Sequence, residues 1–244
     1  MAISIDGYEK LVRAAVTHYW SRLQAQSAQQ RSKDADRGRR SAVTGGKQMD
    51  GFCGLFEWVL ETNGLRGLEI CRHSRLELPG YFRPTKKWDM LVLHREHFVA
   101  ALEFKSQRGP SFGNNLNNRS EEALGLATDL RTAHRKGAYG RDCRRPWIGW
   151  LMLLEKCARS IRPVAVKEPH FPVFPEFRGA SYAERYEIHL RRLVREGFFD
   201  GAALLLSTEE AGPVGDYREP ASDLSIRRMM ASLAGHTAAY LASE

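Results

Sequence analysis

Residues 87–106, KWDMLVLHREHFVAALEFKS, decide how this chain folds. Two apolar runs flank a short polar stretch, which is the pattern of a β-hairpin. Asp89 stands just before the first run, and Glu103 and Lys105 stand at the end of the second. The sequence therefore predicts a hairpin that carries charged side chains at the end away from its turn.

The register of this hairpin decides which charges meet. A turn centred on Glu96, in the middle of the polar stretch, predicts three cross-strand pairs: Leu93 with Val99, Leu91 with Ala101, and Asp89 with Glu103. Residues opposite each other on antiparallel strands have Cβ atoms ~5 Å apart. The turn position therefore predicts that the carboxylates of Asp89 and Glu103 lie close together.

Side chains alternate between the two faces of a strand. In the second strand one predicted face is wholly apolar and belongs to the core; it consists of Phe98, Ala100, Leu102 and Phe104. The other face begins with small apolar residues and ends with charges; it consists of Val99, Ala101, Glu103 and Lys105. The alternation therefore puts the carboxylate and the ammonium on one side of the strand.

Two neighbouring carboxylates repel each other unless a cation lies between them. A hard divalent ion such as Mg²⁺ prefers oxygen ligands and keeps several waters. Asp89 and Glu103 are thus predicted Mg²⁺ ligands, with the backbone carbonyl of Phe104 as a third. Lys105 would orient or help deprotonate a water and stabilise a phosphoryl transition state. This arrangement suits phosphodiester hydrolysis; the alternative is a salt-bridge ladder at a hairpin end.

Composition limits the class of protein. The chain has 244 residues, 43% of them hydrophobic, and a formal net charge of +8. It can bury a substantial core, and its basic excess suits a polyanionic partner. We expect no membrane partner, because no apolar run approaches the ~20 residues of a membrane span. The four cysteines are scattered and show no zinc-binding pattern, so we expect reduced thiols. The N-terminus lacks the character of a signal peptide, so we expect a cytoplasmic protein.

Periodicity and turn signals predict the remaining elements. Helices are expected over 6–26, 50–63 with Asp50 as N-cap, 118–137 with a capping box at Asn118 and Glu121, 181–197 with a capping box at Ser181 and Glu184, and 223–241 capped by Ser222. Further strands are expected over 68–78, 147–154 and 202–207, and loops over 109–118 and 168–177, the latter with its phenylalanines in the core. The sum is a mixed α/β fold: a central mixed β-sheet flanked by helices, with an N-terminal helical extension. Residues 1–48 form that extension and a basic flexible segment, and residues 49–244 form one catalytic and recognition domain.

The pattern Asp89…Glu103-Phe104-Lys105, on a hairpin between helices, resembles the PD-(D/E)xK nuclease superfamily. Longer blocks are similar to the XhoI-like type II restriction endonucleases; they lie at 45–52 (GGKQMDGF), 78–91 (LPGYFRPTKKWDML), 103–125 (EFKSQRGPSFGNNLNNRSEEALG) and 169–187 (PHFPVFPEFRGASYAERYE). The blocks occur in the order of the family, and the resemblance covers about 45–207. Trp88 replaces the usual proline of the superfamily, which carries no chemistry.

This resemblance implies a restriction-endonuclease-like core and a homodimer that acts on double-stranded DNA. It implies Mg²⁺-dependent cleavage of the palindrome 5′-CTCGAG-3′ after the first C, with 5′-phosphate ends and four-base 5′ overhangs, in a prokaryotic restriction–modification system. Asp89, Glu103 and Lys105 match the catalytic motif. The alternatives are a repair or structure-specific nuclease of the superfamily and a DNA-binding protein that has lost cleavage. No Walker A loop, GxGxxG turn or GxSxG elbow occurs, so no nucleotide cofactor is expected.

Other residues are candidates for metal or DNA contacts. The resemblance suggests that Glu57 reaches the metal through water; the alternative is a solvated helix glutamate. The candidate DNA contacts follow the catalytic strand, lie in the proline-rich loop and the helix after it, or lie in the basic segment; they are Ser106, Gln107, Arg108, Asn114, Asn115, Asn117, Arg119, His170, Arg178, Arg185, Arg37, Arg39, Arg40 and Lys47. For Asn118 we prefer a helix-capping role. At least one of Glu121 and Glu122 is explained by the favourable interaction of an acid with the N-terminus of the expected helix. His94 and His97 lie in the hairpin turn and are predicted to be surface residues.

Overall fold

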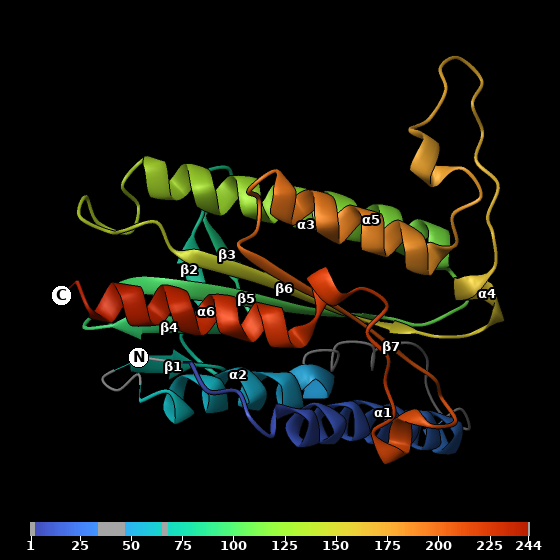
Figure 1. Ribbon diagram of the computed structural model, residues 1–244, viewed down its shortest axis with the longest axis horizontal. Helices are drawn as coiled ribbons and strands as arrows, with labels where there is room; N and C mark the ends of the chain where they lie inside the picture. The colour runs from blue at the N-terminus through green and yellow to red at the C-terminus, as the bar shows by residue number, and fades with distance from the viewer. Residues whose placement is uncertain (1–2, 34–46, 65–67, 244) are drawn as a thin grey trace.

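A five-stranded mixed sheet lies between two layers of helices in the computed structural model (Figure 1). The structure describes residues 3–33, 47–64 and 68–243, without the side chains of residues 28–33 and 47. Helices α3 and α5 cover one face of the sheet, and α1, α2 and α6 cover the other. The predicted mixed α/β fold with an N-terminal helix is confirmed.

The sheet has the order β1-β4-β5-β6-β7. Its strands are β1 (Leu68–Cys71), β4 (Met90–His94), β5 (His97–Gln107), β6 (Trp147–Glu155) and β7 (Gly201–Ser207). β1, β4 and β5 pair antiparallel, whereas β5, β6 and β7 pair parallel. The parallel strands are buried on both faces, which explains the continuous apolar run predicted as a strand over 147–154.

The helices are α1 (Tyr8–Lys33), α2 (Asp50–Thr62), α3 (Phe112–Arg135), α4 (Ala158–Ile161), α5 (Tyr182–Arg195) and α6 (Ile226–Leu241). Short 3₁₀ helices occur at η2 (Lys47–Met49), η3 (Pro175–Phe177), η4 (Gly212–Val214) and η5 (Ser222–Leu224). The expected strand over 68–78 is divided: β1 ends at Cys71, and β2 (Glu77–Pro79) pairs with β3 (Thr85–Lys87) in a separate hairpin. This β2–β3 hairpin leads directly into Trp88 and Asp89.

The N-terminal helix is part of the core. α1 packs against α2 so closely that a Cβ on Gly51 would lie 2.8 Å from the Cα of Ala15, so only glycine fits there. Buried residues of both helices pack under β4 and β5. The division of the chain after residue 48 stays a prediction.

The hairpin of β4 and β5 follows the predicted register only in its first half. Leu91 pairs with Ala101 as expected, but Leu93 pairs with Phe98 instead of Val99, because a bulge follows Val92. The bulge accommodates a tight turn in which Arg95 and Glu96 both have positive φ, 48° and 71°.

The bulge also corrects the predicted faces. Phe98 packs in the same core cluster as Ala101, on the α3 and α5 side, whereas Val99 joins Ala100 on the opposite side. From Ala100 onward the predicted alternation holds. Helices cover both faces of β5, so the first half of the strand is buried on both sides.

The helix α3 differs most from expectation. Residues 112–118 were expected in a loop but form its first two turns, so Asn118 lies inside the helix and does not cap it. The segment is rich in Asn and Gly, and tertiary packing outweighs this low propensity. Phe112 is buried and stacks on Tyr182 of α5, with ring centroids 5.7 Å apart.

Helix starts follow the expected chemistry with small shifts. Ser181 and Glu184 form the predicted capping box of α5. Met49, not Asp50, is the N-cap of α2, and Asp50 lies in the first turn. Ser225, not Ser222, caps α6, because Ser222–Leu224 form a 3₁₀ turn before the helix.

Two further expectations about burial are wrong. The loop over 168–177 projects from one end of the molecule (Figure 1), and Phe171 and Phe174 are 83% and 67% exposed. His94 is buried beneath α6 and packs against the ring of Tyr240, whereas His97 is exposed as expected. None of the described helices has the length and apolar character that a membrane span requires.

Two leucines of α3 provide a test of its observed packing. Leu126 is 2% exposed, whereas Leu124 is 40% exposed. Leu126→Ala should lower the free energy of unfolding by about 2–4 kcal/mol, because it leaves a cavity under the sheet. Leu124→Ala should cost less than about 1 kcal/mol. Urea unfolding measures both; equal losses would contradict this orientation of the helix.

Candidate active site

The site is built where β4 and β5 separate. Their ladder ends at the pair Met90–Leu102, and β5 continues to Gln107 alongside β6. Just outside the ladder, the Asp89 carboxylate accepts a hydrogen bond from the backbone N–H of Phe104 at 2.7 Å. The Asp89 side chain thus binds β5 where a strand partner would have bound it.

The carboxylate of Glu103 lies beside that of Asp89 where the two strands separate. Glu103 is 1% exposed and follows Leu102, the last residue of β5 that pairs with β4. Burial, reinforced by the negative charge of Asp89, raises the pKa of Glu103 above its ordinary value. The predicted proximity of the two acids is therefore confirmed.

Two ammonium groups neutralise Glu103. The Nζ of Lys105 lies 2.5 Å from its Oε1, and the Nζ of Lys86, from β3, lies 3.2 Å and 3.3 Å from its two oxygens. A buried carboxylate needs such partners because an unpaired charge is costly in a poorly solvated site. Lys86 was not predicted as a site residue.

Lys105 is held from two sides. Besides Glu103, it pairs with Glu122 of α3 at 2.9 Å, and its ammonium lies 5.9 Å from the ring of Trp150. Burial would lower the pKa of Lys105, but the two carboxylates outweigh this effect and raise it. For Glu122, an acid, burial acts in the opposite direction and would raise the pKa, but the hydrogen bond and the charge of Lys105 lower it below its ordinary value. The ammonium form of Lys105 is thereby stabilised.

Glu122 corrects an expectation. Because α3 begins at Phe112, Glu121 and Glu122 lie in the middle of the helix and not at its N-terminus. Glu121 is exposed, whereas Glu122 reaches Lys105 of β5 and also pairs with Arg119. The position of Glu122 next to the buried Ala123 and one turn before Leu126 is the signal in the sequence that it lies at the edge of the buried face of the helix.

Helix α2 brings to this pocket an acid that was not predicted as a site residue, whereas the role predicted for Glu57 stays a prediction. Asp50 of α2 lines the same pocket as Asp89 and Glu103. Glu57, nearly two turns further along, pairs with Arg72 at 2.6 Å. Asp50 belongs to the GGKQMDGF block, but its place before an apolar run favours an N-cap in the sequence alone.

A thiol also lies close to the carboxylates. Cys53 of α2 contacts the backbone oxygen of Asp89 at 3.8 Å. Burial, with the charges of Asp89 and Asp50, raises the pKa of Cys53 to about 12. Cys53 therefore stays protonated and is no nucleophile.

The pocket is open and basic at its rim. Its volume is about 760 Å³, and charged residues from four segments surround the two central acids: Asp50, Arg72, Lys86, Lys87 and Lys105. The rim lies between the start of α2 and the base of the β2–β3 hairpin. An anionic substrate can reach the acids along this basic rim.

The acids suit a divalent ion that keeps much of its water. Among the described residues no group of three or more His, Cys, Asp or Glu could hold a metal ion by itself. Asp89 and Glu103, two neighbouring carboxylates that line an open pocket, are instead the incomplete set that Mg²⁺ completes with water and phosphate oxygens. The residues present therefore fit Mg²⁺.

The candidates directly after Lys105 have internal partners. Gln107 is buried at 3% exposure, and its amide binds the backbone oxygen of Phe112 and the hydroxyl of Tyr186. It is thus not exposed to a DNA backbone. Ser106 is half-buried, and Arg108 lies over the ring of Trp20 and pairs with Glu209 at 3.2 Å.

The next candidates lie along the first turns of α3. Asn114 and Asn117 are exposed, and Asn115 and Arg119 are half-buried. Their expected position near the catalytic residues is supported by Arg119, which pairs with Glu122, the partner of Lys105. A helix, and not the predicted loop, presents them.

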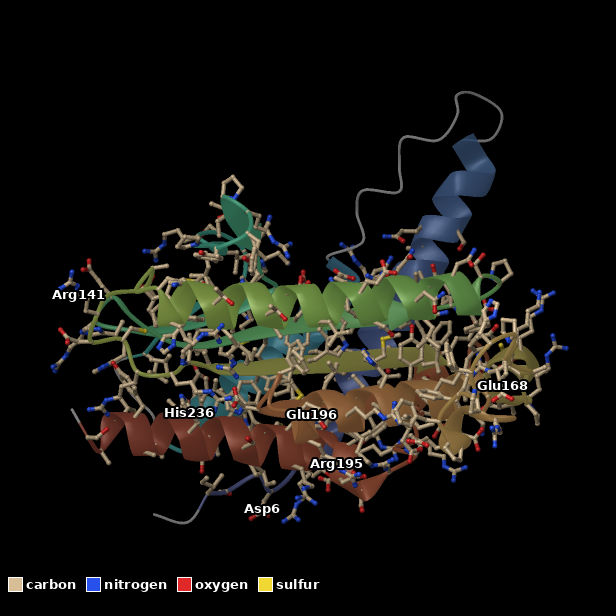
Figure 2. All side chains as sticks on the ribbon, turned by 90° about the horizontal axis from the view of Figure 1, so that it is seen from above. Asp6, Arg141, Glu168, Arg195, Glu196 and His236 are labelled. Carbon is tan, nitrogen blue, oxygen red and sulfur yellow. The ribbon has the colours of Figure 1, made fainter. Side chains whose placement is uncertain are left out.

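The last candidates lie around the projecting loop or outside the described chain. Figure 2 shows Glu168, and with it this loop, at the end of the molecule opposite Arg141. His170 and Arg178 are exposed there, and Arg178 pairs with Glu168 at 3.0 Å. Arg185 donates to the backbone oxygens of Ala180 and Val164, so it fastens the loop. Arg37, Arg39, Arg40 and the side chain of Lys47 lie outside the described residues.

The pairing of Lys105 with Glu103 can be tested on stability. Without metal, at about pH 8, Lys105→Met should lower the free energy of unfolding by about 2 kcal/mol, because Glu103 keeps a charge with one partner fewer. The loss should shrink at about pH 5, since the raised pKa of Glu103 favours protonation as the pH falls.

Urea unfolding at both pH values measures this difference. Lys136→Met, at the exposed end of α3, removes the same charge away from the acids and is the matched control. Equal losses for the two variants, or a loss for Lys105→Met that does not depend on pH, would contradict the ion pairing described above.

Comparisons with known proteins identify the family of the chain. The sequence profile of the family Restriction endonuclease XhoI matches residues 28–219. The chain is 50% identical over 208 residues to the type II restriction enzyme BstVI of Geobacillus stearothermophilus, covering 83% of this chain and 92% of that one. It is 48% identical over 202 residues to the type II restriction enzyme XhoI of Xanthomonas vasicola, covering 81% and 80%. It is 50% identical over 173 residues to AbrI of Azospirillum brasilense, covering 70% and 77%.

No solved structure matches the chain significantly. The family profile covers most of the chain. The three relatives also align with most of the chain at about 50% identity, and all are named as type II restriction enzymes. The chain therefore belongs to the XhoI family of type II restriction endonucleases, site-specific nucleases that bind double-stranded DNA.

Proposed function

We propose that this chain is a Mg²⁺-dependent homodimer that hydrolyses both strands of 5′-CTCGAG-3′ after the first C. The products carry 5′-phosphate ends and four-base 5′ overhangs, and the enzyme acts in the cytoplasm of a prokaryote. The observation that carries the proposal is the pocket in which Asp89, Glu103 and Lys105 meet. The target is taken from the family resemblance, which includes a relative named XhoI.

Asp89 and Glu103, with the backbone carbonyl of Phe104, would hold the Mg²⁺ ion. Type II restriction endonucleases generally need a divalent metal, and when bound it supplies a Lewis acid for the phosphoryl oxygen and lowers the pKa of water. Asp50 is an additional candidate ligand, through water, because it lines the pocket from α2. Glu57, paired with Arg72, is the weaker candidate for this role.

Lys105 acts on the attacking water and on the phosphate. Its raised pKa favours the ammonium form, which donates hydrogen bonds. We therefore assign Lys105 to orienting the water and stabilising negative charge in the transition state, and not to removing a proton. Glu122 keeps the ammonium in place by pairing with it.

DNA would approach from the side on which the pocket opens. Figure 2 shows the β2–β3 hairpin and the C-terminal end of α1 projecting from the same side of the molecule. Arg72, Lys86 and Lys87 on the pocket rim would neutralise phosphates near the cleaved bond. The remaining candidates for DNA contact are Ser106, Arg108, Asn114, Asn115, Asn117, Arg119, His170, Arg178, Arg39, Arg40 and Lys47.

Two-fold symmetry supports the dimer. A palindromic site presents identical half-sites, so a two-fold symmetric pair of chains can read both with one set of contacts. One pocket of this kind serves one scissile phosphate. Two copies therefore suffice to cut both strands.

Cleavage of plasmid DNA tests the activity. With Mg²⁺ and a plasmid carrying one CTCGAG site, the wild-type protein should give one linear product with the stated overhang. Asp89→Ala and Lys105→Ala should lower the cleavage rate by at least about a thousandfold, because each removes a group that stabilises the transition state. In Ca²⁺ both should still retain CTCGAG DNA in a gel-shift assay.

Other results of this experiment would contradict the proposal. Cutting at a different sequence would overturn the assigned target. Smeared products or cutting of branched DNA would indicate a repair or structure-specific nuclease, and specific binding without any cutting would indicate a DNA-binding protein. Unimpaired cleavage by either variant would overturn the assigned catalytic residues.

The acid on α2 provides a separate prediction. Asp50→Asn should slow cleavage by about tenfold or more, because it removes a carboxylate from the pocket rim. Glu57→Gln, on the same helix, should change the rate by less than about threefold, because its partner is Arg72. Single-turnover cleavage rates measure both, and the reverse order would restore Glu57 as the metal-site acid.

A further inference from the structure

We propose that the ammonium of Lys86 is a resident counter-ion of Glu103, which a divalent cation must displace when it binds. This inference rests on the proposed metal-dependent function and assigns a positioning role to a residue outside the catalytic motif. It explains why a buried acid of a metal site is stable in the metal-free protein.

The geometry of the contact is that of a cation on a carboxylate. The Nζ of Lys86 lies 3.2 Å from one oxygen of Glu103 and 3.3 Å from the other, so it spans both. The contact of Lys105 involves one of these oxygens, at 2.5 Å. Lys86 therefore occupies the position that a cation shared by both oxygens would take.

The two lysines differ in how firmly they are held. Lys105 lies on a central strand of the main sheet and has a second carboxylate partner, Glu122, at 2.9 Å. Lys86 comes from the β2–β3 hairpin, and its further contacts are with the backbone oxygen of Lys87 and with the ring of Trp88, 5.6 Å away. Neither of these is a charged partner. Of the two ammonium groups, Lys86 is thus the one that a metal ion can replace.

Displacement needs only rotation of the side chain. The hairpin itself is anchored, because the buried carboxylate of Asp129 accepts the backbone N–H groups of Tyr81 and Phe82 at its tip, both at 2.7 Å. At its base the N–H of Trp88 binds the oxygen of Leu76 at 2.9 Å. The side chain of Lys86 is 22% exposed and lines the open pocket, so the released ammonium remains where a DNA phosphate would lie.

The inference predicts that Lys86 weakens metal binding in the absence of DNA. Tb³⁺, which prefers oxygen ligands, can be titrated into the DNA-free protein at about pH 8 while tryptophan is excited. The rings of Trp88 and Trp150 lie next to the ammonium groups of Lys86 and Lys105, at 5.6 Å and 5.9 Å, so bound Tb³⁺ should luminesce. Lys86→Met should bind Tb³⁺ on the order of tenfold more tightly than wild type, since a competing charge in contact with the carboxylate is gone.

Lys87→Met is the matched control, because it removes the same charge from the next residue of the same strand and the same pocket. It should tighten binding by less than about threefold, through the change in net charge alone. Equal affinities of Lys86→Met and wild type, or equal gains for the two variants, would overturn the inference. Lys86→Gln must reproduce the gain, so that a folding defect of one variant does not decide the result.

Glu103→Gln separates this inference from the proposed function. If it removes the Tb³⁺ signal, the metal lies at Glu103, and the Lys86 variants then decide the inference alone. If it leaves the signal unchanged, the metal lies elsewhere, and both the proposed metal site and the role of Lys86 are overturned.

Discussion

The site depends on one hydrogen bond, from the backbone N–H of Phe104 to the carboxylate of Asp89. It forms where β4 has ended and β5 continues, so a side chain satisfies a backbone donor that would otherwise lack its strand partner. The bond fixes Asp89 beside Glu103 without any contribution from a metal. A longer β4 would pair with β5 at this point and close the pocket.

The charged side chains of the site come from both sides of the sheet. Glu103 and Lys105 project toward α3, where Glu122 extends the alternation of charges, and α2 adds Asp50 from the opposite layer. Each lysine near Glu103 offsets the cost of burying a carboxylate beside another one. The layers are therefore required for the site, because neither layer alone supplies the full set of charges.

Local patterns in the sequence predicted much of this arrangement. The pair Leu91–Ala101, the capping box at Ser181 and the buried strand β6 all follow from short-range rules of alternation, capping and hydrophobic runs. These rules were sufficient to bring Asp89 and Glu103 together. The family resemblance supplied what they did not, namely the expected target sequence and the expected pattern of cleavage.

What the sequence did not reveal depends on tertiary contacts. The early start of α3 requires Phe112 to pack on Tyr182. The contact of Glu122 with Lys105 requires α3 to lie against the end of β5, which local patterns do not show. Lys86 could not be assigned, because nothing in TKKWD shows which of two adjacent lysines faces an acid on another strand. The pairing of β2 with β3 decides this, and the burial of Asp129 beneath the hairpin tip holds that pairing in place.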